Sequence, residues 1–180
     1  MLDPGQRAAW PTTWSRSVRL DPDAKLTRED AILRHKKVLA ARLRDLGLRE
    51  RRCTDDGHCQ FRAFSSELFG TSGHHGYVRR RVVERMRKHA SEFEPFVEGN
   101  FSAYLRAMGR NAWGDELTLQ ACADAFGVVV HVVTAHDVNW HHYYQTREEQ
   151  NLRVLFLSYL HPIHYNVVTG APAQDGEPLL

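Results

Sequence analysis

The spacing of apolar residues changes from helical to strand-like near residue 127, and this change constrains the fold more than any other feature. Before it, apolar side chains recur at helical spacing in segments that end at Gly47, Gly70 and Gly127. After it, residues 128–133 form a continuous β-branched run, which is typical of a buried strand. Helices followed by a cluster of strands predict an α+β domain with a small central sheet packed between helices.

The same pattern predicts where each element lies. We expect helices over approximately residues 28–46, 59–69, 76–90, 92–97, 100–109 and 116–126. We expect strands over approximately residues 128–133, 140–144, 154–159 and 164–168. One folded domain then covers residues 28–169. Residues 1–27 are interpreted as an extended arm, and residues 170–180, rich in Gly, Ala and Pro, as a disordered tail.

Length and charge exclude several classes of protein. A chain of 180 residues fits one compact domain. Its net charge is only +2, which gives no strong attraction to nucleic acid or to an anionic membrane. No run approaches the roughly 20 apolar residues of a membrane helix, and the N-terminus does not resemble a signal peptide. We therefore expect neither a nucleic-acid nor a membrane partner, and we take a monomer as the default.

The number and spacing of the cysteines indicate the kind of cellular compartment. There are three of them, an odd number without metal-type spacing: Cys53, Cys59 and Cys122. This argues against a disulfide framework and for a reducing environment. Cys53 and Cys59 could pair in principle, although nothing else suggests a secreted protein. We expect a cytoplasmic location, with the nucleus or a host cell as alternatives.

The sharpest local feature is the sequence Asp56-Gly57-His58-Cys59 leading into a predicted helix. A cysteine at a helix N-terminus lies at the positive end of the helix dipole, which favours thiolate and lowers the thiol pKa. Free backbone N–H groups there, with those of a preceding glycine turn, can stabilise an oxyanion. Taken alone, this signal is weak, because most cysteines in such places are simply packed.

A nucleophilic cysteine also needs a base and a group that orients the base. His164 and Asn166 lie two apart in a predicted strand, so both side chains point to the same side. Asn166 could hold one ring nitrogen of His164 by a hydrogen bond while the other faces Cys59, as in papain-like sites. The alternative is that His164, one of 11 histidines, merely caps the end of a strand.

Three ordered segments resemble the ovarian-tumour (OTU) family of cysteine deubiquitinases. Residues 56–63 resemble the sequence around that family's catalytic cysteine. The segments 113–127 and 155–166 resemble its central helix and the closing segment with its catalytic histidine. The resemblance covers about residues 50–168, and it implies a papain-type cysteine protease fold.

The resemblance also implies roles for single residues. Cys59 corresponds to the nucleophile, His164 to the general base, and Asn166 to the residue that orients the base. Asp56 corresponds to an aspartate whose loop, with Gly57 and His58, shapes the oxyanion hole together with the Cys59 amide. His58 is expected to be a neighbour of the thiol, although a protonated imidazole there would raise the thiolate fraction.

The implied reaction is hydrolysis of the bond after the C-terminal glycine of ubiquitin, through a cysteine thioester and without a metal or organic cofactor. The implied partner is ubiquitin or a polyubiquitin chain. Two alternatives stay open. One is a protease for a related modifier, such as NEDD8 or an interferon-induced homologue. The other is an OTU-like domain that binds ubiquitin without cleaving it.

Several other residues are candidate site components. Trp113 is a candidate substrate contact, but core packing or a structural wall is the more frequent role. Asp115 is interpreted as a helix N-cap. The histidine pairs at 74–75 and 141–142 lack a completing ligand set, so we expect no dedicated metal site. The arginines between Arg79 and Arg87 are interpreted as a solvated helix face.

Overall fold

A computed structural model describes residues 27–146, 153–161 and 163–170. The chain divides into two units, residues 1–33 and residues 34–180. In the first unit the described residues form the beginning of helix α1 (Arg28–Asp45), and the Thr27 hydroxyl accepts a hydrogen bond from the Asp30 N–H. Most of the predicted arm and all but the first residue of the predicted tail lie outside the described residues.

The second unit is built on a five-stranded mixed sheet with the strand order β1-β5-β4-β2-β3. Strands β2 and β4 are parallel, and the other neighbouring pairs are antiparallel. The strands are β1 (Leu48–Arg51), β2 (Val129–Thr134), β3 (His141–Tyr144), β4 (Val154–Leu160) and β5 (His164–Gly170). Strand β1 pairs with residues 167–170 of β5, so the chain that continues from β1 lies beside the first residues of β5.

One face of this sheet carries the main core. Alternate residues of the central strands, such as Val130, Leu155 and Val167, are buried there. Helices α2 (Cys59–Phe69) and α6 (Glu116–Phe126) pack on this face, with α3 (His75–Lys88) against both. The shorter helices are α4 (Ala90–Phe93) and α5 (Phe101–Met108), and two 3₁₀ turns are η1 (Ser72–His74) and η2 (Glu94–Phe96).

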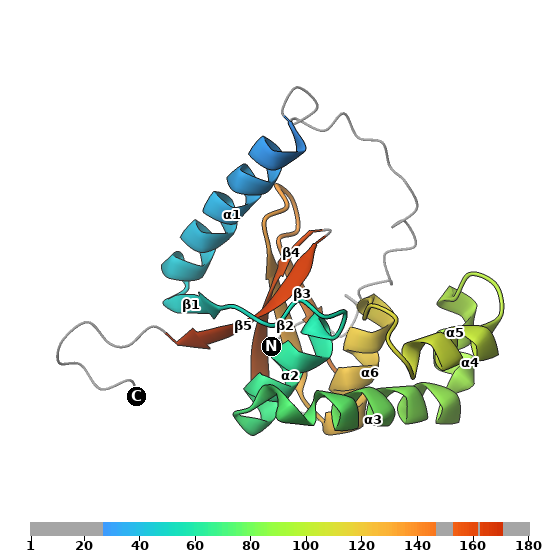
Figure 1. Ribbon diagram of the computed structural model, residues 1–180. Coiled ribbons are helices and arrows are strands. Elements are labelled where there is room, and N and C mark those ends of the chain that lie inside the picture. The colour runs from blue at the N-terminus through green and yellow to red at the C-terminus, as the bar shows by residue number, and fades with distance from the viewer. Residues whose placement is uncertain (1–26, 147–152, 162, 171–180) are drawn as a thin grey trace, which may run out of the picture. The chain divides into compact units, whose positions relative to one another are not determined.

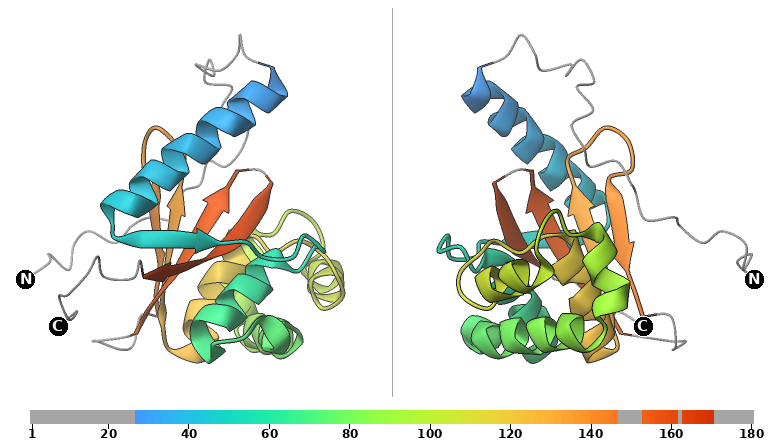
Figure 2. Two further views of the ribbon diagram at one scale, coloured as in Figure 1. Left: turned by 60° about the vertical axis from the view of Figure 1, so that its left-hand side comes forward. Right: turned by 90° about the vertical axis from the view of Figure 1, so that its right-hand side faces the viewer.

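Residues 34–45 of α1 lie on the other side of the sheet from α2, α3 and α6 (Figures 1 and 2). Leu39 and Leu43 are buried there. Arg42 donates hydrogen bonds to the carbonyl oxygens of Thr134 and His136, at 2.8 and 2.7 Å. Its guanidinium also lies over the Trp140 ring. These contacts join the second half of α1 to the segment between β2 and β3, so helices flank the sheet on both sides.

The α+β class and the central sheet are confirmed, and most predicted helices and strands are present within a few residues of their predicted bounds. Strand β1 is the exception, because the sequence pattern did not predict it. Three of its four residues are charged and exposed, so the segment has no apolar alternation to detect. Within the described part of the chain, no helix is long and apolar enough to cross a membrane.

Candidate active site

Cys59 is the first residue of α2, as the sequence predicted, and its side chain is half-buried. Burial raises the pKa of the Cys59 thiol above its usual value, and the backbone N–H groups of Tyr165 and Gln60 offset only part of that rise. The sequence predicted that the helix N-terminus lowers the pKa of Cys59. This prediction is wrong, because desolvation of the thiolate outweighs the effect of the helix N-terminus. A thiol in this position needs a base beside it to react.

The start of β5 lies at this thiol, because the backbone N–H of Tyr165, the residue after His164, is one of the groups that act on the Cys59 sulfur. His164 begins β5 and is only 8% exposed. Its Nε2 lies 3.2 Å from the carbonyl oxygen of Cys53, a contact in which Nε2–H donates. A neutral imidazole that donates from Nε2 carries its lone pair on Nδ1. Nδ1 is buried and has no hydrogen-bond partner among the described residues.

Asn166 does not hold His164 in the way that the sequence suggested. Its Oδ1 accepts a hydrogen bond of 2.8 Å from the backbone N–H of Cys53. The Cys53 residue therefore lies between the two side chains, with its N–H toward Asn166 and its C=O toward His164. The sequence could not show this, because the segment before α2 comes beside β5 only in the folded chain. Any influence of Asn166 on the imidazole passes through the backbone of Cys53.

The loop before the cysteine is held by an ion pair. The Asp56 carboxylate accepts from the Arg62 Nε and Nη2 at 2.9 and 2.6 Å, and from the His58 N–H at 3.1 Å. The hydrogen bond from Arg62 lowers the pKa of Asp56 to about 2. Gly57 has a φ of +78°, which side-chain-bearing residues rarely adopt. The loop is therefore fixed by Arg62, one turn into α2, with its backbone turned at Gly57.

His58 is held on its other side by Arg79 of α3, whose Nη2 lies 2.8 Å from Nδ1 of the ring. Burial, and then the charge of Arg79, lowers the pKa of His58. An Nδ1 that accepts from a guanidinium belongs to a neutral ring. The conditional role of a protonated His58 in raising the thiolate fraction is therefore not what this geometry favours.

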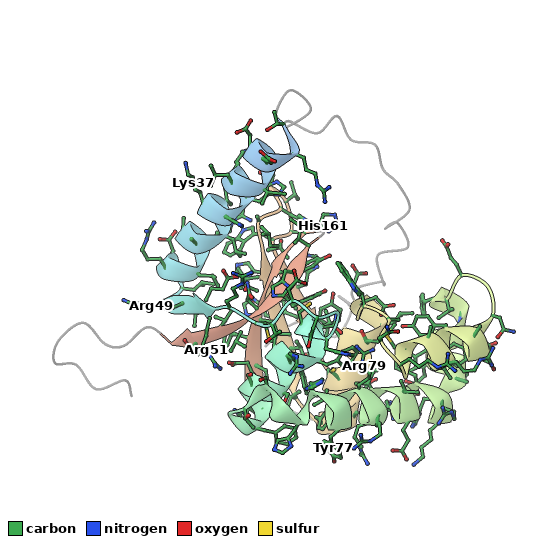
Figure 3. The ribbon with its side chains drawn as sticks, in the orientation of Figure 1. Lys37, Arg49, Arg51, Tyr77, Arg79 and His161 are labelled. Carbon is green, nitrogen blue, oxygen red and sulfur yellow. The ribbon has the colours of Figure 1, made fainter. Side chains whose placement is uncertain are left out.

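Arg79 itself was misinterpreted from the sequence as part of a solvated helix face. It is 4% exposed, and its Nη1 donates to the carbonyl oxygens of Met108 and Ala112. Figure 3 shows Arg79 directed from α3 toward the start of α2, whereas Tyr77 on the same helix points away. Its spacing from Val82 and Val83 puts it on the apolar face of α3, a signal that helical periodicity contained. Arg79 thus joins the loop before Cys59 to the segment after α5.

Trp113 lies beside Gly57 of this loop, and Gly114 lies against Gln60 of α2. Trp113 is 61% exposed, so it is not a core residue, and a Cβ on Gly57 would lie 3.6 Å from its Nε1. Gly114 has no room for a side chain, because a Cβ there would overlap the side chain of Gln60. The exposed indole beside Gly57 is compatible with the predicted substrate contact.

The start of α6 is tied to the residue after the nucleophile. Gln60 donates from Nε2 to the carbonyl oxygen of Asp115 and accepts from the Thr118 hydroxyl, at 2.9 and 2.7 Å. Asp115 is the N-cap that the sequence predicted, and it forms a capping box with Thr118. The first turns of α2 and α6 are therefore locked together beside Cys59.

Sequence reasoning missed four contributors to this arrangement: the backbone of Cys53, Gln60, Arg62 and Asp55. The Oδ1 of Asp55 lies 3.6 Å from Nδ1 of His164, and the Asp55 side chain is 62% exposed. No pattern in the sequence singles out Cys53, because its contribution comes from its backbone. Among the described residues, no group of three or more His, Cys, Asp or Glu side chains is arranged to hold a metal ion.

Comparison with known proteins gives a consistent family. The family described as OTU-like cysteine protease matches residues 54–166. The chain is 35% identical over 141 residues to OVARIAN TUMOR DOMAIN-containing deubiquitinating enzyme 10 of Arabidopsis thaliana, covering 78% of this chain and 39% of that protein. It is 35% identical over 149 residues to enzyme 12 of the same plant, covering 81% of this chain and 68% of that protein.

Solved structures share the fold. The OTU domain of OTUD1 superposes with a TM-score of 0.70 at 24% identity, over 78% of this chain and 99% of that one. An OTU domain solved in complex with ubiquitin superposes with a TM-score of 0.58 at 19% identity, over 68% of this chain and 69% of that one. The chain spans about two fifths of the length of enzymes 9 and 10 of the plant series, which are longer proteins.

Proposed function

The chain belongs to the OTU-like cysteine proteases, and we propose from this that it is a deubiquitinase with Cys59 as nucleophile and His164 as general base. One observation carries the proposal. A half-buried thiol at the N-terminus of α2 lies beside the start of β5, where the imidazole of His164 keeps a buried Nδ1 without a hydrogen-bond partner among the described residues. That nitrogen is free to take the thiol proton.

The chemistry follows from the state of the thiol. Because burial raises the pKa of Cys59, the thiol is protonated at rest and gives its proton to Nδ1 of His164 as it attacks. The sulfur adds to the carbonyl carbon of the ubiquitin C-terminal glycine. His164 then returns the proton to the leaving lysine amine, and a thioester remains. Water activated by the same nitrogen attacks the thioester, which releases ubiquitin and restores the thiol.

The residues around the pair have supporting roles in this proposal. The Cys53 carbonyl accepts from Nε2 and keeps His164 in the tautomer that has a basic Nδ1. Asp55, 3.6 Å from Nδ1, stabilises the imidazolium that forms during attack. The loop with Asp56, Gly57 and His58 shapes the oxyanion hole together with the backbone N–H of Cys59, while the His58 N–H is held by the Asp56 carboxylate. The Asp56 carboxylate is occupied by Arg62 and takes no proton.

The partner of this site is ubiquitin or a polyubiquitin chain in our proposal. Support comes from the names of the relatives, which are deubiquitinating enzymes, and from the OTU domains of the same fold that were solved with ubiquitin. We place the reaction in a reducing intracellular compartment, because the nucleophile must stay a free thiol, as all three cysteines are here. A net charge of +2 gives no strong attraction to nucleic acid or to an anionic membrane, so we propose that neither is a partner, and we keep a monomer as the default.

The test is covalent capture. The protein is incubated with ubiquitin whose C-terminus carries a thiol-reactive group, beside a Cys59→Ala variant and a Cys122→Ala control. We expect a mass increase of one ubiquitin on the parent and on Cys122→Ala, and none on Cys59→Ala. Parallel probes made from NEDD8 and from the interferon-induced homologue determine which modifier is preferred. No adduct from any probe on the folded protein contradicts the proposal and leaves a domain that binds without cleaving.

A further inference from the structure

The sulfur of Cys53 lies beside the proposed nucleophile. Its Sγ is 3.6 Å from the carbonyl oxygen of Cys59, and the thiol is only 6% exposed. Burial, followed by the neighbouring Cys59, raises the pKa of Cys53. Cys53 is therefore a protected, protonated thiol next to a more accessible one. The reaction proposed above uses the backbone of Cys53 and leaves its sulfur without a role.

We propose that Cys53 is a resolving thiol that forms a reversible disulfide with Cys59 when a hydroperoxide oxidises the nucleophile. The inference rests on the proposed function only in making Cys59 the reactive thiol of the pair. It adds an oxidation site that joins Cys53, in the loop before α2, to Cys59, the first residue of α2.

The chemistry takes two steps. In the first, His164 takes the Cys59 proton, and the sulfur attacks one oxygen of the peroxide. An S–O bond forms, the O–O bond breaks, and the leaving hydroxide is protonated to water. In the second, the Cys53 sulfur attacks the Cys59 sulfenic acid. An S–S bond forms, the S–O bond breaks, and the departing hydroxide takes the Cys53 proton as water. The protein loses two protons and two electrons, and each equivalent of peroxide yields two of water.

The order of attack follows from exposure. Cys59 is half-buried and gives its proton to His164 in the proposed reaction, whereas Cys53 is more deeply buried and has no base assigned to it. Peroxide therefore reacts first with Cys59. Cys53 reacts only after its neighbour has become an electrophile. Cys122 is fully buried in α6 and stays outside this chemistry.

The loop between the two cysteines can bring them together. A disulfide needs Cβ atoms about 3.8 Å apart, so the segment must tighten. Residues 52–58 contain neither helix nor strand, and Thr54 and Asp55 are exposed, so resistance to movement comes from the buried Cys53 side chain and from the two backbone hydrogen bonds of Cys53. Residues 56–58 are anchored through Arg62 and Arg79. The adjustment therefore falls on residues 53–55.

Formation of the disulfide changes more than the nucleophile. The backbone of Cys53 accepts from His164 and donates to Asn166. Movement of Cys53 toward Cys59 strains both hydrogen bonds. Oxidation therefore blocks the Cys59 thiol and, at the same time, weakens the hydrogen bond that positions His164. Thiol reductants reverse both effects, because the ring closed by the disulfide is short and reducible.

The sequence makes a direct mass-spectrometric test possible. Trypsin cleaves after Arg52 and Arg62, and the peptide between them holds Cys53 and Cys59 with no internal Lys or Arg. The full chain is treated with hydrogen peroxide, denatured, blocked with an alkylating reagent and digested. We expect residues 53–62 to be lighter by two hydrogen atoms and unalkylated, and to be restored by dithiothreitol. Cys122, in another peptide, should remain alkylated throughout.

Cys53→Ser is the informative variant, with Cys122→Ser as its matched control and circular dichroism as the check on folding. In Cys53→Ser we expect dimedone to trap the Cys59 sulfenic acid and prolonged peroxide to give sulfinic acid, with lost activity not regained on reduction. The parent and Cys122→Ser should form the disulfide and regain activity. Each protein is compared with its own untreated activity, because Cys53 also contacts His164.

The inference is overturned if the parent and Cys53→Ser carry the same oxygen adducts on Cys59 while Cys53 of the parent stays alkylated. This readout needs no ubiquitin, so it is independent of the proposed function. A disulfide without any adduct in the ubiquitin-probe experiment supports the inference and contradicts the function. An adduct with the ubiquitin probe but no disulfide supports the proposed function and contradicts the inference.

Discussion

At the residue scale, the site depends on the backbone of one residue, Cys53, which no side-chain motif in the sequence reveals. The backbone N–H of Cys53 donates to the Asn166 Oδ1 at 2.8 Å, and the backbone C=O of Cys53 accepts from the His164 Nε2 at 3.2 Å. The neutral Asn166 side chain therefore positions the base by fixing the segment that carries the acceptor. This makes its effect weaker than that of a direct contact to the imidazole.

Replacing Asn166 tests this indirect role. We expect Asn166→Ala to lower kcat/KM by about tenfold, and His164→Ala by about a thousandfold or more, because only His164 moves the proton. Asn166→Asp should recover most of the loss, since its carboxylate still accepts from the Cys53 N–H. The measurement is steady-state hydrolysis of a fluorogenic ubiquitin substrate. Equal losses in Asn166→Ala and His164→Ala would show direct participation instead.

The Asp56–Arg62 ion pair predicts a pH dependence of stability. The pKa of Asp56 is lowered to about 2 by its hydrogen bond from Arg62. A carboxyl with a depressed folded-state pKa contributes stability that is present above its unfolded pKa and is lost as pH falls through the folded value. The free energy of unfolding of Asp56→Asn should therefore lie below that of the parent at pH 7, and the gap should shrink between about pH 4 and about pH 2. Urea denaturation measures it.

The control for this prediction is Asp45→Asn, a change at an exposed position in the last turn of α1. Its stability should follow that of the parent at every pH. A gap for Asp56→Asn that persists unchanged at the lowest pH would mean that the charge of Asp56 contributes nothing to stability.

At the element scale, α3 acts as a brace for the start of α2. A single buried arginine on α3, Arg79, reaches the ring of His58 and the carbonyl oxygens of Met108 and Ala112. Its guanidinium also lies 4.1 Å from the ring centroid of Phe61 in α2. Three chain segments thus contact one side chain. The loop before Cys59 is positioned by α3, a helix that contributes no reacting group.

Arg79→Met should therefore cost both stability and activity. Loss of a charged donor to buried carbonyl groups costs about 3 kcal/mol, and His58 loses its partner. The matched control is Arg81→Met on the exposed face of the same helix, which should change stability by less than about 0.5 kcal/mol. Thermal denaturation and the ubiquitin-probe reaction rate measure the two effects. Similar results for the two variants would contradict the bracing role.

At the scale of the whole molecule, the sheet face away from α2 and α6 holds a buried histidine, His131. His131 of β2 is 5% exposed, and its Nε2 lies 2.7 Å from Nδ1 of His141 in β3. The ring also stacks on Tyr143 and contacts Phe156. Burial, and then the neighbouring His141, lowers the pKa of His131 to about 4. The folded state thus holds this ring neutral.

This predicts acid sensitivity well above the titration of carboxyl groups. A histidine with a depressed folded-state pKa binds its proton first in the unfolded chain, so stability is complete above about pH 6.5 and falls as pH drops toward 4. His131→Phe keeps an aromatic ring beside Tyr143 and Phe156 without a titrating group. Melting temperatures measured from about pH 8 to about pH 4.5 should fall less for this variant than for the parent. Parallel curves would show that His131 does not contribute.

What the sequence determined by itself was local. Helical spacing, glycine stops and the β-branched run indicated most elements, and they placed Cys59 at the start of a helix and His164 at the start of a strand. The Asp115 cap was also readable, because capping depends on residues within one turn. Such features depend on the preferences of a few neighbouring residues, and the order of the motifs was enough to identify the family.

Only the tertiary structure decided how these pieces act on one another. Strand β1 exists because β5 pairs with it, and Arg79 is buried because segments from three parts of the chain enclose it. Cys53 contacts His164 across a separation of 111 residues. The pKa of Cys59 rises because the folded chain removes water from its sulfur. Burial and long-range hydrogen bonds depend on which distant segments meet, and no local pattern of residues records that.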